Sequence, residues 1–505
     1  ILSNLTLCSP FIRMRRLTLL FLLFYKSIFA SFDMNENIEK SYSHILNLNF
    51  DKANALLSKE QSSNPNNGFI PLYKNYIDFL TILITEDVDY FESHKDFKVR
   101  RIDLLDGNDT SSPYYLYAKA EITLQWAFSR LKFEQYVVAA YEIIKAYKLL
   151  EENKQKFPDF TLNNKGLGLI HSLLGAVPKD LYWIIHLAGI NGGVSLGLKE
   201  LDELLNDNRF IMYEDEVLFL LSFLHINLEN NDVLINDFLD RIGNRYKDNI
   251  LLNFTACRLL HNLGKNDDCI AILQSRKDNN QTIAFCYLDY LEGMSYLYML
   301  DLKNAKRKFE YFIENFRGVN YIKSAYHKLA WIAFLQNEHN DKLAYFQKVI
   351  LEGNAVIDED KVALNNAKKG VIKKDNLNFR LLRSRLLYDG GYYEDARLEI
   401  SSIEIQNINL DFQDEYFYRL ARIESKLSSE DTTIIKYYQK AFEVGQNFNN
   451  YYAPMSALQI GLIYERKRDT KRAASYFNKC LSISGFDYQR GIHQKAKAGL
   501  ARILD

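Results

Sequence analysis

Apolar and polar positions follow the period of an α-helix along most of the chain. From about residue 210 onward, the apolar positions fall in segments of about 12 to 16 residues that are separated by short turns. Small residues occur in pairs about twelve positions apart, one in each of two successive segments. Two antiparallel helices approach closely only where both have small side chains, because protein interiors are close-packed. The pattern therefore predicts a series of helix hairpins.

The clearest hairpin is predicted over residues 454–485. Small residues on its two helices and rings beside them resemble the markers of a tetratricopeptide repeat, whose period is about 34 residues. The five marker positions are Gly461, Tyr464, Ala473, Phe477 and Cys480. A second set has the same spacing: Gly293, Tyr296, Ala305 and Phe309.

Weaker units with the same arrangement stand in tandem with these two. They are Ala330 with Phe346, Ser384 with Leu387 and Ala396, Ala421 with Tyr438 and Ala441, and Cys257 with Leu260 and Cys269. Near the start, residues 50–57 are typical of the second helix of such a hairpin, and a closing helix over 492–504 is expected to cap the array. The predicted fold is all-α, a right-handed helical-hairpin solenoid of tetratricopeptide-type repeats.

The middle of the chain departs from this period. Two long helices are predicted over 114–131 and 133–155, before a Gly-rich passage that ends near residue 205. Residues 118–205 resemble the tetratricopeptide repeat protein 39 family, which implies a non-enzymatic helical protein. The matching positions are Gly166, Gly168, Leu173, Leu174, Pro178, Gly189, Gly193, Gly197 and Leu201.

The glycines of this passage have a mechanical interpretation. Gly166 and Gly168 allow close packing of helices, Pro178 begins the next helix, and residues 191–193 are expected to turn through positive φ angles. A phosphate-binding loop is disfavoured, because the passage follows a helix and lacks the lysine of a nucleotide loop.

The amino-terminal segment is typical of a secretory signal. Arg15 and Arg16 precede an apolar stretch over 17–25, and Ala30 offers a small residue for cleavage. We expect residues 1–30 to be leader and signal, with Met14 as the native start, so that the protein is secreted across the inner membrane and is periplasmic. No transmembrane helix is expected in the mature chain. We further expect an atypical helical region over 31–206 and the repeat array over 207–505.

Composition narrows the function. Lys plus Arg (63) nearly equals Asp plus Glu (64), and no basic run occurs, so nucleic acid is not an expected partner. The nine His residues are scattered without metal-ligand spacing, and no nucleophile motif occurs. His171 and His186 both fall in the Gly-rich passage, but structural histidines are the more common outcome. We therefore expect no metal, no cofactor and no enzyme.

Cys257 and Cys269 occupy the two small positions that face each other across one predicted hairpin. In an oxidising compartment they form a candidate disulfide. The alternative is that both are small buried residues, because cysteine packs well at such positions.

The repeat register also predicts a partner-binding groove. In stacked helix pairs the first helices line the concave face, where side chains suit an extended peptide or a partner helix. These positions are Tyr287, Tyr290, Met294, His327, Trp331, Phe334, Arg385, Tyr388, Tyr418, Arg422, Leu458 and Glu465. The expected function is a scaffold for protein–protein interaction in cell-envelope assembly, and the alternative is a carrier for an apolar or lipid ligand.

Overall fold

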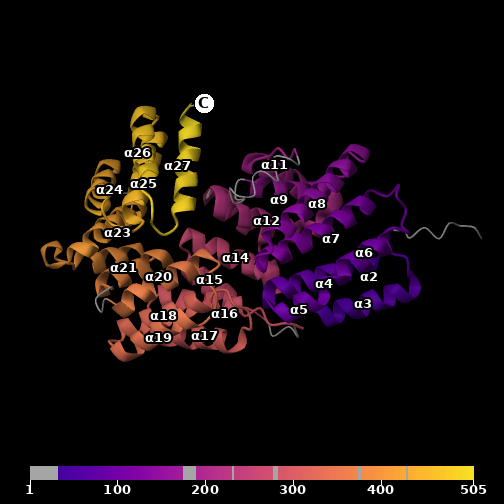
Figure 1. The fold of residues 1–505 in the computed structure, drawn as a ribbon, viewed down its shortest axis with the longest axis horizontal. Helices are drawn as coiled ribbons and strands as arrows, with labels where there is room; N and C mark the ends of the chain where they lie inside the picture. The colour runs from indigo at the N-terminus through magenta and orange to yellow at the C-terminus, as the bar shows by residue number, and fades with distance from the viewer. Residues whose placement is uncertain are drawn as a thin grey trace, which may run out of the picture. The chain divides into compact units, whose positions relative to one another are not determined.

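The computed structural model describes residues 32–174, 189–229, 232–276, 282–372, 377–427 and 430–504. Within these ranges the secondary structure consists of α-helices, short 3₁₀ turns and one π-turn, with no strand (Figure 1). The predicted signal, Pro178 and His186 lie outside the described residues.

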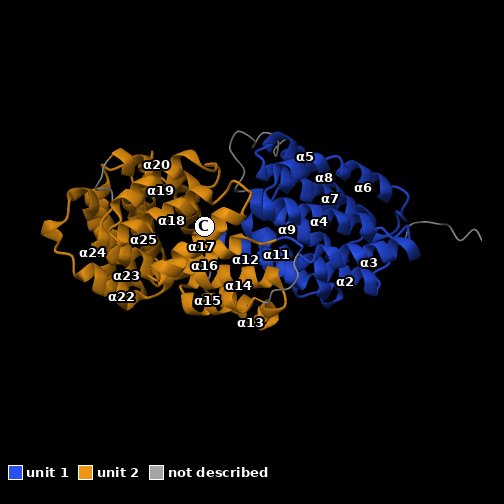
Figure 2. Cartoon of the chain, turned by 90° about the horizontal axis from the view of Figure 1, so that it is seen from below, with its two compact units in different colours: residues 1–229, 278–283 blue, residues 230–277, 284–505 orange. Residues whose placement is uncertain are grey.

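The chain divides into two compact units (Figure 2). Unit 1 comprises residues 1–229 and 278–283, and unit 2 comprises residues 230–277 and 284–505. The short return to unit 1 is held at Thr282, whose backbone NH donates to the Leu48 carbonyl at 3.0 Å. Its hydroxyl accepts from the backbone NH of Asp51 at 2.9 Å. The boundary expected from sequence, at 206/207, precedes helix α12, which the structure includes in unit 1.

The described part of unit 1 begins with a helix hairpin and contains the two long helices expected in the middle of the chain. Its α-helices are α2 (Glu36–Leu46), α3 (Phe50–Ser63), α4 (Phe69–Thr85), α5 (Val88–His94), α6 (Phe97–Leu105), α7 (Pro113–Lys132), α8 (Tyr136–Lys156), α9 (Asn163–Leu173), α11 (Val194–Leu205) and α12 (Glu214–Leu224). A 3₁₀ turn, η3 (Asn208–Tyr213), precedes α12, and a π-turn, η4 (His225–Glu229), follows it.

Unit 2 contains most of the predicted repeats. Its α-helices are α13 (Asp232–Ile242), α14 (Ile250–Leu263), α15 (Asn266–Gln274), α16 (Tyr287–Tyr298), α17 (Leu302–Asn315), α18 (Ile322–Leu335), α19 (His339–Leu351), α20 (Asp358–Ile372), α21 (Phe379–Gly390), α22 (Tyr393–Ser401), α23 (Gln413–Lys426), α24 (Asp431–Gly445), α25 (Tyr452–Arg466), α26 (Thr470–Ser482) and α27 (Gln489–Leu504). Short 3₁₀ turns are η5 (Arg245–Lys247), η6 (Ile405–Asn407) and η7 (Leu410–Phe412). The successive pairs from α14/α15 to α25/α26 include the predicted hairpins, so the all-α solenoid of tetratricopeptide-type repeats is confirmed.

The small positions close the hairpins as the sequence predicts. A Cβ added to Gly461 would lie 2.6 Å from the ring of Phe477, which is fully buried. Where the first small residue is serine, its hydroxyl donates to the carbonyl of the second, twelve residues later. Ser384 bonds Ala396 in this way at 3.0 Å, and Ser41 bonds Ala53 at 3.3 Å. The hydroxyl therefore ties the paired helices together as well as leaving room for their approach.

In unit 1 the close approach between α9 and α11 involves the backbone itself. A Cβ added to Gly197 would lie 2.2 Å from the Gly168 carbonyl oxygen, and one added to Gly168 would lie 2.7 Å from the Gly197 carbonyl oxygen. The mechanical interpretation of the Gly-rich passage holds for these helices. The prediction of positive φ angles at residues 191–193 was wrong. The positive φ, +66°, belongs to Gly189, whereas Gly193 is extended and precedes α11.

Unit 2 is closed by a contact between distant turns. Helix α16 packs against α21 as well as against its hairpin partner α17. The turns that follow α14 and α21 meet at glycines, since a Cβ on Gly391 would lie 1.6 Å from the Gly264 carbonyl oxygen. Tyr392 reinforces the junction by accepting from Asn266 Nδ2 at 3.1 Å and donating to Asp267 at 2.5 Å. We call this junction the clasp.

The last helix caps the array, as expected from its sequence. Helix α27 packs on α25 and α26, and its buried Ile492 and Ala496 join the core of that hairpin. Arg502 forms an ion pair with Glu465 of α25 at 2.6 Å.

Candidate functional site

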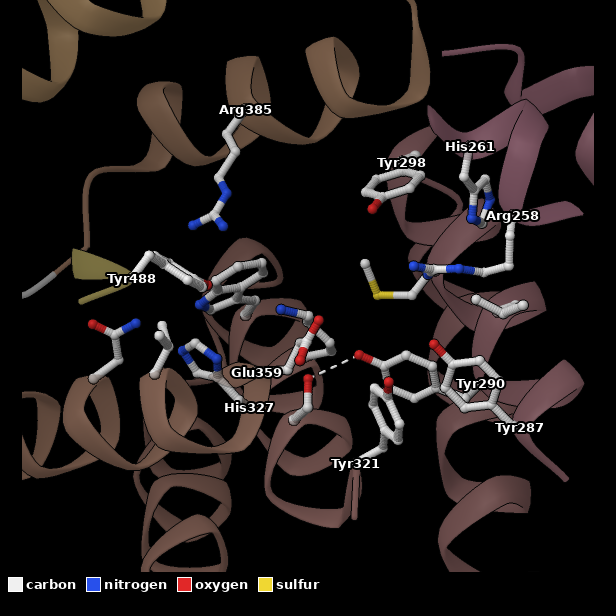
Figure 3. A pocket seen from close by; sticks show the side chains of 17 residues that line it. Arg258, His261, Tyr287, Tyr290, Tyr298, Tyr321, His327, Glu359, Arg385 and Tyr488 are labelled. Carbon is white, nitrogen blue, oxygen red and sulfur yellow. Dashed lines mark hydrogen bonds between the residues drawn. The ribbon is translucent and has the colours of Figure 1, made fainter. Parts of the chain in front are cut away.

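Unit 2 contains a pocket of about 170 Å³. Helices α14, α16, α18, α20 and α21 contribute its walls, together with Tyr488 just before α27 (Figure 3). The clasp fixes the distance between two of these walls, because it joins the turns that follow α14 and α21. The pocket therefore lies where the first helices of several hairpins face a common interior.

Half of the twelve predicted groove positions meet in this pocket. They are Tyr287, Tyr290, Met294, His327, Trp331 and Arg385. They come from three separate helices, so the repeat register brings together residues that are up to about 100 positions apart in sequence. Their role in binding stays a prediction.

The other predicted positions lie elsewhere in unit 2 and have intramolecular partners. The Phe334 ring packs 6.4 Å from that of Phe379, and the Arg422 guanidinium lies 4.0 Å from the ring centre of Tyr388. Tyr418 and Leu458 are buried in core clusters, and Glu465 is held by Arg502. The structure does not bring these six to the pocket. Near the end of the array, the capping helix α27 covers positions that the register alone would leave open.

One wall of the pocket is a cluster of tyrosines. The ring centres of Tyr287 and Tyr321 are 4.5 Å apart, and those of Tyr290 and Tyr321 are 5.2 Å apart. The Tyr290 hydroxyl is hydrogen-bonded to the Ser324 hydroxyl at 2.8 Å (Figure 3). Burial raises the pKa of Tyr290 well above its ordinary value, so the hydroxyl stays protonated at neutral pH.

Tyr321 has an unusual backbone conformation that the neighbouring helix supports. Its φ of +65° lies in the left-handed region, which is costly for a residue with a Cβ. The carboxylate of Asp360, at the start of α20, accepts from the backbone NH of Tyr321 at 2.7 Å and from that of Ser324 at 2.8 Å. These bonds cap α18 and hold the Tyr321 ring at the pocket.

Three cationic side chains line the pocket, against a single carboxylate, Glu359. Two of them approach the same indole: Lys328 Nζ lies 3.9 Å from the Trp331 ring centre and Arg385 Cζ lies 4.8 Å from it. The third, Arg258, comes from α14. Because indole faces attract cations, Trp331 contacts both side chains favourably.

This arrangement shifts the titration of its members. Burial, and then the charge of Arg385, lowers the pKa of Lys328 from 10.5 to about 7. Burial, and then the charge of Lys328, lowers the pKa of His327 well below its ordinary value, so its imidazole is neutral at pH 7. Beside the neutral imidazole of His327, the pocket thus contains two arginines and one lysine that titrates near neutral pH.

Two buried nitrogen atoms of the pocket have no hydrogen-bond partner. His327 is 2% exposed and Trp331 is 3% exposed. His327 Nε2 and Trp331 Nε1 make no hydrogen bond with any described residue. A buried polar atom without a partner is costly and calls for an explanation, such as a ligand that supplies the missing bond.

Sequence reasoning missed several lining residues, and a signal existed for two of them. Taking Cys257 as the small residue of its hairpin, the register that selects Met294 also selects Arg258 and His261 on α14. Tyr321 and Tyr488 lie just before helices with φ of +65° and +63°, outside any helical register.

A different charged cluster lies inside unit 1. Lys165 on α9 is 2% exposed, and its ammonium lies 2.9 Å from Glu121 on α7 and 2.9 Å from Glu216 on α12. It also donates to the Tyr76 hydroxyl, which in turn donates to Glu121 at 2.9 Å. Burial lowers the pKa of Lys165, but the attraction of the two carboxylates outweighs it, and the net shift is upward. The positive charge of Lys165 is therefore compensated within the protein by two carboxylates.

The remaining candidate residues have intramolecular partners. His171 is buried and bonded to Glu200 at 2.6 Å, as a structural histidine would be. Cys257 and Cys269 are buried free thiols, and each donates to the backbone carbonyl of the other, at 3.9 Å and 3.6 Å. The disulfide stays a prediction, which peptide maps with and without reductant would test.

Within the described ranges, no group of three or more His, Cys, Asp or Glu side chains is placed to hold a metal ion. The helices there include none with both the length and the apolar character to cross a membrane.

Comparison with known proteins identifies no relative by sequence. No family model matches the chain, and no curated protein matches it. Among solved structures it is similar to a chain in the crystal structure of the APC/C hetero-tetramer Cut9–Hcn1, at 12% identity and a TM-score of 0.27. It is also similar to yeast Tom70, at 11% identity and a TM-score of 0.23. Each match covers 92% of this chain and 95% of the other. Likenesses this weak carry no argument about function.

Proposed function

We propose that this chain is a non-enzymatic scaffold, and that unit 2 holds a segment of a partner protein in its pocket. One observation carries the proposal: six positions that the repeat register assigns to a binding face converge on a single pocket. Surface polar groups are ordinarily satisfied by water, but here two enclosed nitrogen atoms find no hydrogen-bond partner among the described residues. A bound segment of the partner would supply the missing hydrogen-bond partner.

The size of the pocket fits one side chain or a short segment. Its volume of about 170 Å³ is close to the roughly 150 Å³ cavity that accepts benzene in an engineered protein, and it is below the roughly 300 Å³ of the smallest drug-like sites. Rings and charged side chains line it together, which suits an amphipathic protein segment. Recognition would then rest on one anchoring group, with the surrounding helices contributing shallower contacts.

The cellular location of the protein belongs to the same proposal. The predicted signal over 14–30 supports export, and hence a role in the periplasm as part of a cell-envelope assembly. The alternative, a carrier for an apolar or lipid ligand, is less well supported. An acyl chain would need a longer and drier cavity than one lined by Arg258, Lys328 and Arg385.

A crosslinking experiment tests the scaffold. The tagged full chain would be captured from crosslinked cells beside Arg385→Gln, which alters the pocket, and Arg383→Gln as the matched control. Arg383 lies on the same helix but pairs with Glu399 at 2.6 Å, away from the pocket. We expect one partner to be lost with Arg385→Gln and retained with Arg383→Gln. Equal recovery from both variants would contradict a partner-binding pocket.

A further inference from the structure

We infer that the unit 2 pocket binds a tetrahedral oxyanion of the phosphate type, held between the arginines of α14 and α21. The inference rests on the proposed function and makes it more specific, because it assigns the chemistry of the anchoring group. The pocket surrounds its contents with donors and with positive charge, and each of these features has a separate structural origin.

The charge balance favours an anion. Three cations line the pocket with one carboxylate, so positive charge is in excess among the lining residues when Lys328 is protonated. Arg385 has a distant partner in Asp389, at 3.7 Å, whereas no ion pair with a described residue holds Arg258 or Lys328. Lys328 and Arg385 also both lie over the ring of Trp331. A bound anion would stabilise a cluster that otherwise repels itself.

The hydrogen-bonding capacity favours a tetrahedral group. Each guanidinium offers a planar fork of donors that matches two oxygens of a phosphate or a carboxylate. Arg258 and Arg385 enter from different helices, and Figure 3 shows them on separate sides of the pocket. The indole NH of Trp331 adds a buried donor that lacks an acceptor. A planar carboxylate has only two oxygens to share among these groups, whereas a phosphate presents oxygens in several directions.

The pocket is also built to keep its donors in place. Trp331 packs against His327 at 4.7 Å between ring centres, and His327 packs in turn on the core residue Phe346 at 6.1 Å. The clasp fixes α14 relative to α21, and Asp360 fixes the start of α18. Preorganised donors lose little conformational entropy when a ligand binds.

Isothermal titration calorimetry of the full chain tests the inference with three probes: inorganic phosphate, sulfate and acetate, at a fixed ionic strength. We expect phosphate and sulfate to saturate a single site and acetate to bind at least about tenfold more weakly, because it lacks the additional oxygens. Acetate binding as tight as sulfate would overturn the tetrahedral assignment. Absence of saturable sulfate and phosphate binding would overturn the inference altogether.

Variants locate the site. Arg258→Gln and Arg385→Gln should each weaken sulfate binding by about tenfold or more, and Arg383→Gln should leave it unchanged. Lys328→Met removes a cation without leaving a buried charge behind, so it should fold and should also weaken binding. Circular dichroism confirms that each variant is helical before it is titrated. Sulfate binding that persists in folded Arg258→Gln and Lys328→Met would place the site elsewhere and overturn the inference.

A last comparison separates the two sources of a phosphate group. A short peptide with one phosphoserine is titrated beside its unphosphorylated form and beside inorganic phosphate. Tighter binding of the phosphopeptide than of inorganic phosphate supports a modified side chain of the partner, and equal binding supports a free phosphate ligand. If no partner is captured while an oxyanion binds, only the scaffold proposal is contradicted. If a partner is captured while no oxyanion binds, only the oxyanion inference is contradicted.

Discussion

Two lysines, Lys165 buried and Lys328 half-buried, have opposite surroundings. Lys165 in unit 1 lies between two carboxylates and a tyrosine hydroxyl, and its pKa is raised. Lys328 in unit 2 lies over an indole beside an arginine, and its pKa falls to about 7. Both ammonium groups lie over aromatic rings, so the difference between the two pKa shifts lies in the neighbouring charges.

The difference indicates in which region the lysine already has compensating partners within the protein. A buried charge with compensating partners fixes one arrangement of its helices, here α4, α7, α9 and α12. A buried charge without partners destabilises the folded protein, and such groups concentrate where a ligand is to be bound. Unit 1 therefore has the character of a structural core at Lys165, and unit 2 that of an open site at Lys328.

The largest expected effect is the loss of the unit 1 cluster. Lys165→Met would leave Glu121 and Glu216 buried without a counter-charge, so we expect a loss of about 3–5 kcal/mol in the free energy of unfolding. Hydrogen exchange of the α7 and α9 peptides would measure it as reduced protection.

The compensating variant sharpens this prediction. Lys165→Met combined with Glu121→Gln and Glu216→Gln removes all three charges and should recover much of the lost stability. If the single variant were as stable as the parent, the cluster would not be a structural core.

The next effect concerns the close approach of α9 and α11. Gly197→Ala places a methyl group against the Gly168 carbonyl, which cannot move without shifting the helix, so we expect a loss of about 1–3 kcal/mol. Gly193→Ala is the matched control, because a Cβ there meets no atom within 4 Å. Urea denaturation of both variants provides the comparison, and equal midpoints would refute the close approach.

The smallest expected effect is a gain of stability at Lys328. Its folded pKa of about 7 lies below the unfolded value near 10.4, so between these values the unfolded chain binds more protons and stability rises with pH. We expect Lys328→Met to be more stable than the parent at pH 7, with the difference shrinking by about 1–2 kcal/mol by pH 9. Urea midpoints at the two pH values measure it.

Lys303→Met, on the exposed face of α17, is the control for this measurement. It should show no such pH dependence. A parallel trend in both variants would mean that the shift does not originate in the pocket.

The sequence predicted contacts between residues that are close in sequence well, and contacts between residues that are far apart in sequence poorly. The hairpins were predictable because Gly461 and Ala473, or Ser384 and Ala396, are separated by a fixed twelve residues. The register also selected Tyr290 and Trp331, which line the pocket. No pattern indicated the Lys165 cluster, because its partners are 44 and 51 residues away in sequence and come from helices outside any repeat period.

The same limit applies to the ends of the array. Leu458 and Glu465 satisfy the register of a groove, but a helix that follows them covers one and pairs with the other. Whether a concave position is open depends on the tertiary placement of its neighbours, which sequence spacing alone does not give.

The clasp between Gly264 and Gly391 changes the mechanics of this solenoid. In stacked repeats each unit ordinarily touches only its neighbours, so the array can stretch or twist around what it binds. Here two turns 127 residues apart touch through their backbones, so the coil between them is a closed ring. The contact opposes lengthening of this ring, which keeps the helices that line the pocket at a set separation.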